Sequence, residues 1–572
     1  MERKIINDSF SVSGQISAAE IEGLSAQQVK SLICNRPDNE APDQPAFQSL
    51  QQEAERQGIT MQHLPVVHDT INADDVLAFE QLYDKAAKPV HAFCRSGLRS
   101  VTLWSLMQIK QGVAPEQVIQ QAQAAGFDFS KFTEKFAAVI ETLRGKGSGQ
   151  QVSGAADSDA PKATQSHEIV IVGAGAAGIS VASSLLRRDP TLDIALIDPA
   201  ESHYYQPGFT FVGGGVFDLA VTRRSMQSLI PAGVKWIRAA VQSFQPENNL
   251  VMLDNQTGIA YQQLIVCPGL KLNWAGVEGL EETLGKNGVT SNYSPTTAPY
   301  TWELVKKLKQ GRAIFTQPPM PIKCAGAPQK ALYLSADYWL KKGLLGSAIQ
   351  VEFCNAGAVL FGVKDFVPAL QQYMDKYQAT LSYNHNLVKV DGPAHKAWFS
   401  VTRESGEKEM VEKEFDLLHV CPPQQAPDFI RQSPLVDQAG WVDVDQQTMQ
   451  HKRFANIWSL GDASNTPNAK TAAAVRVQAP IVAENLLYSR QGKSEHYDYN
   501  GYGACPLTVE RGKIVLAEFG YGGKLLPTLP VSLLKGTSPT RLAWFLKEKV
   551  MPRLYWNGML KGKEVLVKPG KG

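Results

Sequence analysis

The sequence of 572 residues lacks the features of several special classes of protein. It contains no uninterrupted apolar run of about 18 residues, so we expect no helix that spans a membrane. Its net charge is only +2, whereas a dedicated nucleic-acid-binding protein needs a strongly basic face. Its seven cysteines are scattered and form no C-x-x-C pair. We therefore predict no disulfide framework, no metal site and no nucleic-acid partner.

The N-terminal stretch MERKIINDSFSVSG also lacks the apolar segment of a secretory signal. Together with the scattered cysteines, this predicts a reducing, cytoplasmic setting. Hydrophobic residues make up 44% of the chain and charged residues 20%, as in ordinary globular proteins. A chain of this length is too long for one core, and about two to four domains are expected.

A sharp change of composition marks a domain boundary. Between Gly145 and Ser166 the chain reads GKGSGQQVSGAADSDAPKATQS, and Val152 is its single large aliphatic residue. Such a segment buries too little apolar surface to order itself. We therefore predict one domain over residues 1–144, a flexible linker over 145–166 and a larger part that begins at residue 167.

The first domain alternates two kinds of apolar pattern. VKSLICNRP (29–37) and PVHAFC (89–94) are short apolar runs, as in buried parallel strands. DDVLAFEQLYDKAA (74–87) and SVTLWSLMQIKQG (100–112) carry apolar residues at helical spacing. This alternation predicts an α/β domain.

The larger part opens with a glycine-rich turn. HEIVIVGAGAAGISVASSLLRR places Gly173, Gly175 and Gly178 between an apolar strand and a helix, and Asp198 ends the next strand. The glycines allow a tight turn, an approach of the backbone to a pyrophosphate and close packing of helix on strand. The aspartate is placed to bind a ribose hydroxyl. The pattern predicts a dinucleotide-binding βαβ unit.

A second motif favours FAD over NAD as that dinucleotide. RFANIWSLGDASN places Gly461 and Asp462 after an apolar strand. Alone this pair would be read as an ordinary turn, but with the first motif it matches a flavin fingerprint. A second nucleotide fold is expected near Ala313, yet no G-x-G-x-x-G follows its strand and the chain leads to Cys324. A nicotinamide partner is therefore disfavoured.

From about His167 nearly to the C-terminus, the sequence resembles the sulfide:quinone oxidoreductase family, in particular the group with the mitochondrial enzymes. The resemblance predicts a tandem Rossmann FAD flavoprotein over residues 167–535. The strings that carry it are HYYQPGFTFVGGG (203–215), PIKCAGAPQKALYLSADYW (321–339), FGVKDF (361–366), GWVDVD (440–445), KTAAAV (470–475) and LYWNGML (554–560).

The resemblance implies a reaction as well as a cofactor. Sulfide or a persulfide would react at a redox-active cysteine, here Cys324, and electrons would pass through FAD to a membrane quinone. The sulfur would then leave to a thiol or to sulfite. Gln206 and Val241 match positions that contact FAD in the family. Lys470 matches a lysine at the pyrimidine edge of the flavin.

The sequence departs from the expected family pattern at Ala463, where we expect the second redox cysteine directly after the Gly-Asp pair. Either Cys324 works alone, or the substrate is a preformed persulfide, or this half is a degenerate sensor. The remaining cysteines of this part are interpreted as small buried hydrophobic residues. They are Cys267, Cys354, Cys421 and Cys505.

The C-terminal segment, residues 536–572, is predicted to be amphipathic. Ser538 is placed to cap a helix whose first residue is Pro539. From Arg541 onward there are eight Lys or Arg residues against two acidic ones. Such a segment either lies in a membrane interface or packs on the body of the protein. The family resemblance favours a monotopic attachment on the cytoplasmic side. The bulky apolar residues are Leu542, Trp544, Phe545, Leu546, Met551, Leu554, Tyr555 and Trp556.

The N-terminal domain has its own cysteine loop, CRSGLR. Cys94 ends a strand, Gly97 opens a helix and Arg99 follows, which predicts an anion-binding cradle with a lowered thiol pKa. The alternative is a buried cysteine beside surface arginines. The loop resembles rhodanese sulfurtransferases, whereas the rest of the domain resembles the phosphatase-like Blh (beta-lactamase-hydrolase-like) family.

Sulfur transfer with Cys94 as the persulfide carrier is favoured over phosphate hydrolysis. The loop is one residue shorter than the Cys-to-Arg loop of cysteine phosphatases, since residue 100 is a serine. In the phosphatase interpretation Asp69 and Asp74–Asp75 would form a general-acid loop. A helix cap is the preferred interpretation of these acids. A homo-oligomer is also expected.

Overall fold

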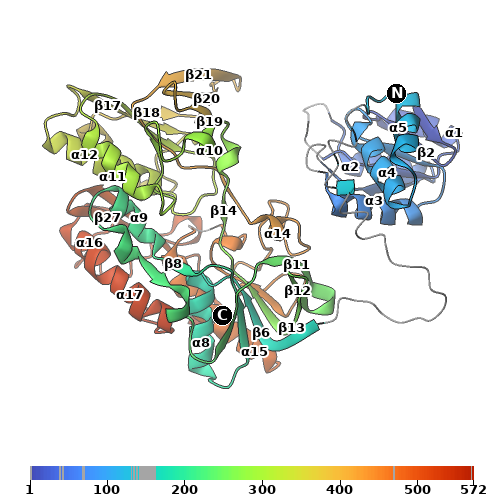
Figure 1. Ribbon diagram of the computed structural model, residues 1–572. Coiled ribbons are helices and arrows are strands. Elements are labelled where there is room, and N and C mark those ends of the chain that lie inside the picture. The colour runs from blue at the N-terminus through green and yellow to red at the C-terminus, as the bar shows by residue number, and fades with distance from the viewer. Residues whose placement is uncertain are drawn as a thin grey trace. The chain divides into compact units, whose positions relative to one another are not determined.

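The computed structural model describes residues 3–37, 40, 44–66, 71–129, 132, 136, 139–140, 163–467, 470–567 and 570–571. The chain divides into two compact units, unit 1 over Met1–Ser158 and unit 2 over Asp159–Gly572 (Figure 1). Up to residue 162, the predicted linker lies outside the described residues. From Ala163 onward the prediction is wrong, because these residues pair with strand β13 (Gly258–Val266) and begin strand β6 (Ala163–Val172).

The described part of unit 1 is a five-stranded sheet in the order β1-β2-β5-β3-β4, with helices packed on it. The pair β1–β2 is antiparallel and the other pairs are parallel. Every residue of β3 and β5 is buried, as their apolar runs predicted. The elements are β1 (Lys4–Asn7), β2 (Phe10–Ser13), α1 (Ala18–Ala26), β3 (Ser31–Cys34), α2 (Phe47–Arg56), β4 (Thr60–His63), α3 (Ala73–Lys85), β5 (Val90–Phe93), α4 (Leu98–Lys110) and α5 (Pro115–Ala124).

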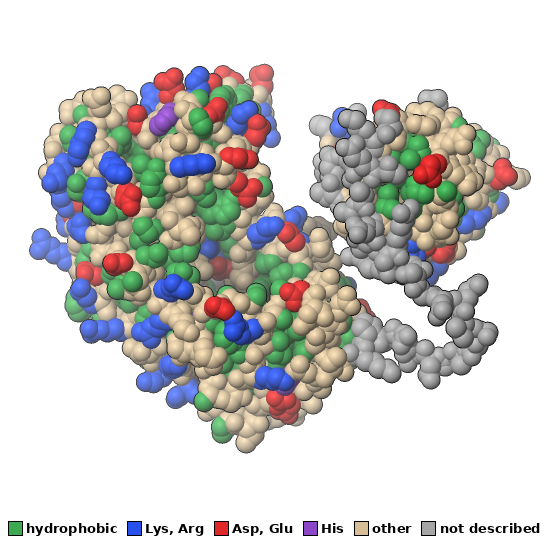
Figure 2. Space-filling view, in the orientation of Figure 1, with side chains coloured by type: hydrophobic (Ala, Val, Ile, Leu, Met, Phe, Trp, Pro, Cys, Tyr) green, Lys and Arg blue, Asp and Glu red, His purple; other side chains and the backbone are tan. Residues whose placement is uncertain are grey.

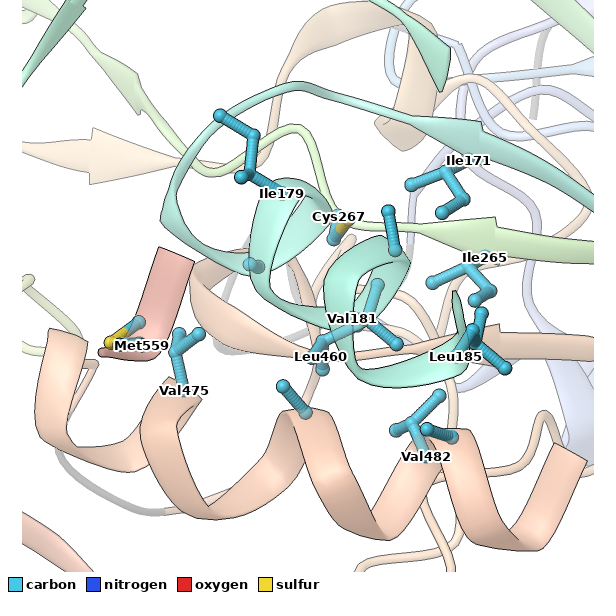
Figure 3. Packing of buried hydrophobic residues seen from close by; sticks show 14 of the residues in the cluster. Ile171, Ile179, Val181, Leu185, Ile265, Cys267, Leu460, Val475, Val482 and Met559 are labelled. Atoms are coloured by element: carbon cyan, nitrogen blue, oxygen red, sulfur yellow. The ribbon is translucent and has the colours of Figure 1, made fainter. Parts of the chain in front are cut away.

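Unit 2 contains the predicted βαβ unit in a sheet of order β10-β7-β6-β13-β12-β11, with β24 beside β13. Helices α8 and α15 pack against each other and on this sheet, and Figure 3 shows apolar side chains between the two helices, among them Val181 of α8 and Val475 and Val482 of α15. The elements are α8 (Ala176–Arg188), β7 (Ile194–Ile197), β10 (Val234–Ile237), β11 (Val241–Gln245), β12 (Leu250–Leu253), β24 (Ile457–Ser459) and α15 (Ala472–Arg490).

A second parallel sheet confirms the expected tandem nucleotide-binding architecture. Its order is β15-β22-β16-β17-β18, and a three-stranded antiparallel sheet β19-β20-β21 adjoins it. The elements are β15 (Val289–Thr290), α11 (Ala298–Lys307), β16 (Gly311–Gln317), α12 (Ala327–Lys341), β17 (Ile349–Asn355), α13 (Val367–Lys376), β18 (Thr380–Tyr383), β19 (His385–Asp391), β20 (Lys396–Thr402), β21 (Lys408–Glu414) and β22 (Leu417–His419).

A hairpin and the C-terminal segment complete unit 2. The hairpin β26 (Gly503–Glu510) and β27 (Lys513–Phe519) packs on α12, while α16 (Arg541–Phe545) and α17 (Met551–Asn557) lie beside β27 and α9 (Phe209–Gly213) (Figure 1). Shorter strands are β8 (Ser202–Tyr204), β9 (Arg223–Ser225), β14 (Lys271–Leu272), β23 (Gln424–Gln425), β25 (Tyr497–Asp498) and β28 (Gly570–Lys571), and the shorter helices include α10 (Leu280–Thr283) and α14 (Asp428–Arg431).

The start of the C-terminal helix differs from the prediction. Thr540, and not Ser538, is the N-cap, and its hydroxyl oxygen accepts from the Ala543 N–H at 3.2 Å. The helix begins late because Thr540 exchanges both of its backbone hydrogen bonds with Ile514 of β27, which keeps the chain extended up to that residue. Among the described residues, no helix is both long and apolar enough to cross a membrane.

Charges are mixed over the surface of unit 2. On the face that Figure 2 shows, Lys and Arg side chains are interspersed with Asp and Glu side chains. Among the described residues, no three His, Cys, Asp or Glu side chains cluster closely enough to hold a metal ion.

Candidate active site

A cavity of about 510 Å³ in unit 2 collects most of the predicted site residues. Its wall contains Gly175, Asp198, Gln206, Cys324, Gly461, Asp462 and Lys470. These residues come from the glycine turn, the second nucleotide fold and the late Gly-Asp motif, so the fold brings three distant parts of the sequence to one place.

The glycine turn leaves bare backbone facing this cavity. Gly173 has φ +101°, and a Cβ on Gly178 would lie 1.8 Å from the Gly173 carbonyl oxygen, so helix and strand can approach only with glycine there. Gly175 is the N-cap of α8, and a Cβ on it would meet no protein atom within 4 Å. The free N–H groups of α8 are thus open to an anionic ligand.

Asp198 lies beside the glycine turn. It follows β7, and its two carboxylate oxygens accept from the backbone N–H groups of Ala174 at 2.7 Å and Ala200 at 2.8 Å. These bonds fix the carboxylate at the glycine turn. Val241, by contrast, begins β11 and is not part of the cavity wall.

The opposite wall carries Asp462 and a buried lysine. The Lys470 ammonium is 6% exposed, donates to the backbone oxygens of Asp462 and Ser464 at 2.8 Å each, and lies 3.9 Å from the ring centre of Trp441. Burial lowers the pKa of Lys470 to about 8, and burial also raises the pKa of Asp462. The bare backbone, the two aspartates and the lysine together fit a flavin cofactor.

A cysteine of the cavity wall, Cys324, lies beside a second cysteine, Cys505. Cys324 has φ +51°, and its N–H donates to the Lys470 carbonyl oxygen at 2.9 Å. Its Sγ lies 3.5 Å from the Sγ of Cys505 on β26. The buried Lys330 of α12 donates from Nζ to the Cys324 Sγ at 3.0 Å.

The surroundings make the two sulfurs chemically unequal. The hydrogen bond from Cys505 and the charge of Lys330 hold the pKa of Cys324 well below its usual value. The same contact with Cys324, with burial, raises the pKa of Cys505 well above its usual value. The surroundings thus favour the thiolate form at Cys324 and the thiol form at Cys505.

The expectation that Cys324 has no cysteine partner is therefore wrong. Cys505 is buried, as expected, but it is within reach of Cys324, and Ala463 is a fully buried residue of another core cluster. No local spacing could reveal the pair, because 181 residues separate the two cysteines. The close approach depends on Gly326, where a Cβ would lie 2.9 Å from the Cys505 sulfur.

The other three cysteines of unit 2 are buried, as predicted. Cys267, Cys354 and Cys421 are each at most 2% exposed. Burial raises the pKa of all three thiols, that of Cys421 to about 12. They are small hydrophobic residues of the core.

The C-terminal segment contributes to the cavity and packs partly on the body. Tyr555 and Trp556 are 5% and 4% exposed, and the Tyr555 hydroxyl lies 2.7 Å from His203 Nε2. Lys547 is buried and donates to the Pro207 carbonyl oxygen at 3.3 Å. Burial lowers the pKa of Lys547 to about 7.

In unit 1, Cys94 ends β5 and is 1% exposed. The Gly97 N–H donates to its sulfur at 3.2 Å, and Gly97 is the N-cap of α4 with φ +87°. Arg99 pairs with Glu40, yet its NH1 atom is buried and has no hydrogen-bond partner among the described residues. The structure thus holds both the buried cysteine and the predicted cradle.

The acids proposed for a general-acid loop are only partly described. Asp69 and the side chain of Asp74 lie outside the described residues. Asp75 and Asn72 exchange hydrogen bonds between side chain and backbone N–H at 3.0 and 3.2 Å, at the start of α3. The helix-cap interpretation is confirmed at Asp75.

Comparison with known proteins gives the family. The mitochondrial sulfide:quinone oxidoreductase of Dictyostelium discoideum is 42% identical over 399 residues, which are 69% of this chain and 86% of the relative. The chain belongs to the sulfide:quinone oxidoreductase family. Residues 167–301 match the family model of pyridine nucleotide-disulphide oxidoreductases. The sulfide:quinone oxidoreductase of Aquifex aeolicus shares the fold, with a TM-score of 0.58 and 18% identity over 69% of this chain and 92% of that chain.

Unit 1 matches a second family. Residues 2–111 match the model of the beta-lactamase hydrolase-like protein, phosphatase-like domain. The beta-lactamase hydrolase-like protein of Agrobacterium fabrum is 32% identical over 143 residues, which are 24% of this chain and 33% of the relative. Both matches confirm the fusion that the sequence predicted.

Proposed function

We propose that unit 2 is an FAD-dependent oxidoreductase that oxidises sulfide to sulfane sulfur and passes the electrons to a quinone. The observation that carries the proposal is the pair of sulfurs 3.5 Å apart, of which that of Cys324 lies on the wall of a cavity that fits a flavin. The family relationship, shared with proteins named for this reaction, supports it.

FAD, when bound, supplies a two-electron acceptor that can be reoxidised by a quinone. The cysteines supply the sulfur chemistry. Joining Cys324 and Cys505 as a disulfide releases two electrons, which a bound flavin would accept. Hydrosulfide can then attack one sulfur of the disulfide, form an S–S bond to it and release the other as a thiolate. The thiol with the lower pKa is the better leaving group, so attack at the Cys505 sulfur releases Cys324, which Lys330 stabilises.

The persulfide formed on Cys505 must then give its outer sulfur to a second nucleophile. A thiol or sulfite is the acceptor that we propose, since each can attack the outer sulfur and return a cysteine thiolate. Lys547 and Lys330 place positive charge at this end of the cavity, because each interacts electrostatically with the two cysteines. Such charge favours an anionic nucleophile.

The proposal is tested with the purified, flavin-loaded protein, sulfide and a soluble quinone. We expect sulfide to bleach the flavin absorbance and quinone to restore it. Cys324→Ser and Cys505→Ser should each lower turnover by at least about 100-fold, as for loss of a nucleophile. Cys354→Ser, a buried cysteine outside the cavity wall, is the matched control. Wild-type protein that neither bleaches nor turns over would reject the proposal.

We also propose peripheral attachment to the cytoplasmic side of a membrane, because the quinone partner is lipid-soluble. The outward side of the C-terminal segment supports this, since Leu542, Phe545 and Val550 are 38%, 54% and 38% exposed. The exposed cations Arg541, Lys549 and Arg553 flank them. Exposed apolar side chains beside cations suit a membrane interface.

For unit 1 we propose sulfur transfer with Cys94 as the persulfide carrier. The support is the short loop with a backbone N–H on the Cys94 sulfur, in one chain with a sulfide-oxidising unit. Phosphate-ester hydrolysis is the second candidate, and the match of residues 2–111 to a phosphatase-like family model favours it. In both reactions the buried Arg99 would bind the anionic group.

A further inference from the structure

The hairpin β26–β27 presents a single carboxyl group to the cavity. Glu518 lies on β27, two residues after Leu516 on the same face of the strand, and both belong to the cavity wall. Its side chain is buried, with the residue 6% exposed. The same cavity wall carries apolar side chains of the hairpin, of the loop after it and of the C-terminal segment: Leu516, Leu529, Leu546, Val550, Met551 and Leu554.

Three donors hold the Glu518 carboxyl group in place. The Tyr502 hydroxyl lies 2.6 Å from Oε1, the Thr528 hydroxyl bonds the same oxygen, and the Thr528 N–H donates to Oε2 at 3.2 Å. Tyr502 and Thr528 also belong to the cavity wall, and their hydroxyls are 2.8 Å apart. Burying a carboxyl group is costly unless such bonds compensate it.

No lysine or arginine is paired with Glu518 among the residues that the structure describes. The nearest charged partner of the network is Arg476 of α15, whose NH2 lies 3.4 Å from the Tyr502 hydroxyl. Its NH1 donates to the Val565 carbonyl oxygen at 2.8 Å, and the arginine is partly exposed. Tyr502 thus links the Glu518 carboxyl group to the partly exposed Arg476, and all three residues belong to the cavity wall.

We propose that Glu518 is the acid that protonates the bound quinone. This inference rests on the proposed function, in which a quinone occupies the apolar part of the cavity. Reduction of a quinone to a quinol takes up two electrons and two protons. A bound, reduced flavin would supply both electrons together with one hydrogen, and Glu518 would supply the remaining proton.

The transfer is balanced at each atom. The O–H bond of Glu518 breaks, an O–H bond forms at a quinone carbonyl oxygen, and the carboxylate that remains accepts hydrogen bonds from Tyr502 and Thr528. Solvent then returns one proton to Glu518 by way of the Tyr502 hydroxyl. No further oxidant or reductant is needed.

The test separates the two half-reactions by stopped-flow absorbance of the flavin. In Glu518→Gln we expect sulfide to reduce the flavin within about twofold of the wild-type rate, because the cysteines are untouched. Reoxidation by a soluble quinone should fall by at least about 100-fold, the usual contribution of a general acid. Reoxidation by ferricyanide, which takes electrons without protons, should be unchanged.

Glu510→Gln is the matched control. Glu510 lies on the same hairpin but is bonded to Lys376 and Lys513 outside the cavity wall. The Glu510→Gln variant should leave the rate of reduction by sulfide and both rates of reoxidation unchanged.

Quinone affinity, measured by quenching of flavin fluorescence, should be the same in Glu518→Gln as in wild type, because the amide keeps an acceptor oxygen.

Several results would overturn the inference. One is reoxidation of Glu518→Gln by quinone at the wild-type rate. Another is a loss of the ferricyanide rate as large as the loss of the quinone rate, because this would indicate a structural role for Glu518. If Glu518→Gln fails to retain flavin, Tyr502→Phe tests the return of the proton to Glu518 instead. A normal first turnover with slowed later turnovers supports proton return through the Tyr502 hydroxyl. Unchanged later turnovers reject it. A wild-type protein that quinone cannot reoxidise would instead reject the proposed function.

Discussion

At the scale of single residues, the environment of Cys324 decides its chemistry. A cysteine at this position in the sequence is only a candidate, but Lys330, 2% exposed, brings an ammonium to 3.0 Å from its sulfur. The Cys505 sulfur lies 3.5 Å from the same sulfur and shares a hydrogen bond with it. Both favour the anion, so the pKa of Cys324 lies below that of a free thiol.

Lys330→Met should therefore make Cys324 less reactive at neutral pH. Loss of the ammonium removes a group that favours the thiolate, so the pKa of Cys324 rises and the pH profile of its alkylation moves upward. At a pH below the pKa, the thiolate fraction falls about tenfold when the pKa rises by about one. The measurement is alkylation by iodoacetamide against pH, read by mass spectrometry on the Cys324 peptide.

Lys341→Met is the control for that substitution. Lys341 lies on the same helix, α12, but its side chain is 58% exposed and pairs with Asp337 at 2.7 Å. Its alkylation profile should overlay that of the wild type. Coincident profiles for Lys330→Met and wild type would show that Lys330 does not set the pKa of Cys324.

At the scale of secondary-structure elements, the C-terminal segment divides its side chains between body and surface. The buried Tyr555 and Trp556 belong to the same hydrophobic core as the residues of β6 and α8, which flank the glycine turn. Phe545 is more than half exposed. A helical stretch that is rich in apolar residues and cations does not show by its sequence which side packs on the protein and which side faces outward. Only the residues that pack against it decide this.

Two substitutions in this segment should therefore have opposite effects. Trp556→Ala should lower the free energy of unfolding by about 3–5 kcal/mol, as for a buried tryptophan. Phe545→Ser should change it by less than about 0.5 kcal/mol but weaken sedimentation with vesicles of anionic phospholipid. Thermal unfolding and vesicle co-sedimentation measure the two effects.

Met410→Ser is the control for vesicle binding, since Met410 is 59% exposed on β21, far along the chain from the C-terminal segment. It should bind vesicles as the wild type does. If Phe545→Ser also binds as the wild type, the C-terminal segment does not attach the protein to membranes.

At the scale of the whole molecule, the chain joins two units that each contain a cysteine loop beside a helix N-terminus. After turnover with sulfide and quinone, we expect mass spectrometry to find a persulfide on Cys94. A transferred sulfur forms a new S–S bond at Cys94 and leaves the donor as a thiolate. The persulfide should be absent in Cys324→Ser, which cannot oxidise sulfide, and Cys34 of unit 1 should stay unmodified.

The opposite result favours the second candidate for unit 1. Hydrolysis of an aryl phosphate that Cys94→Ser abolishes, with no persulfide on Cys94 in wild-type protein, would identify a phosphatase. The expected homo-oligomer also stays a prediction, which light scattering of the purified chain can test.

The sequence alone determined the local parts of this protein. Gly173, Gly175 and Gly178 with Asp198 predicted the βαβ unit, because turn geometry and helix–strand packing depend on residues close together in the chain. The apolar runs of β3 and β5 and the resemblance strings likewise indicated the two-part α/β architecture. These features need only short-range information.

Only the tertiary structure decided which distant residues meet. Cys324 and Cys505 are 181 residues apart and come to 3.5 Å because the hairpin packs on α12. Lys547 lines the cavity and bonds to Pro207, 340 residues away, and Glu518 gains the Tyr502 and Thr528 hydroxyls as partners only in the folded chain. Burial and charge at a site are properties of the packed chain, so no spacing in the sequence records them.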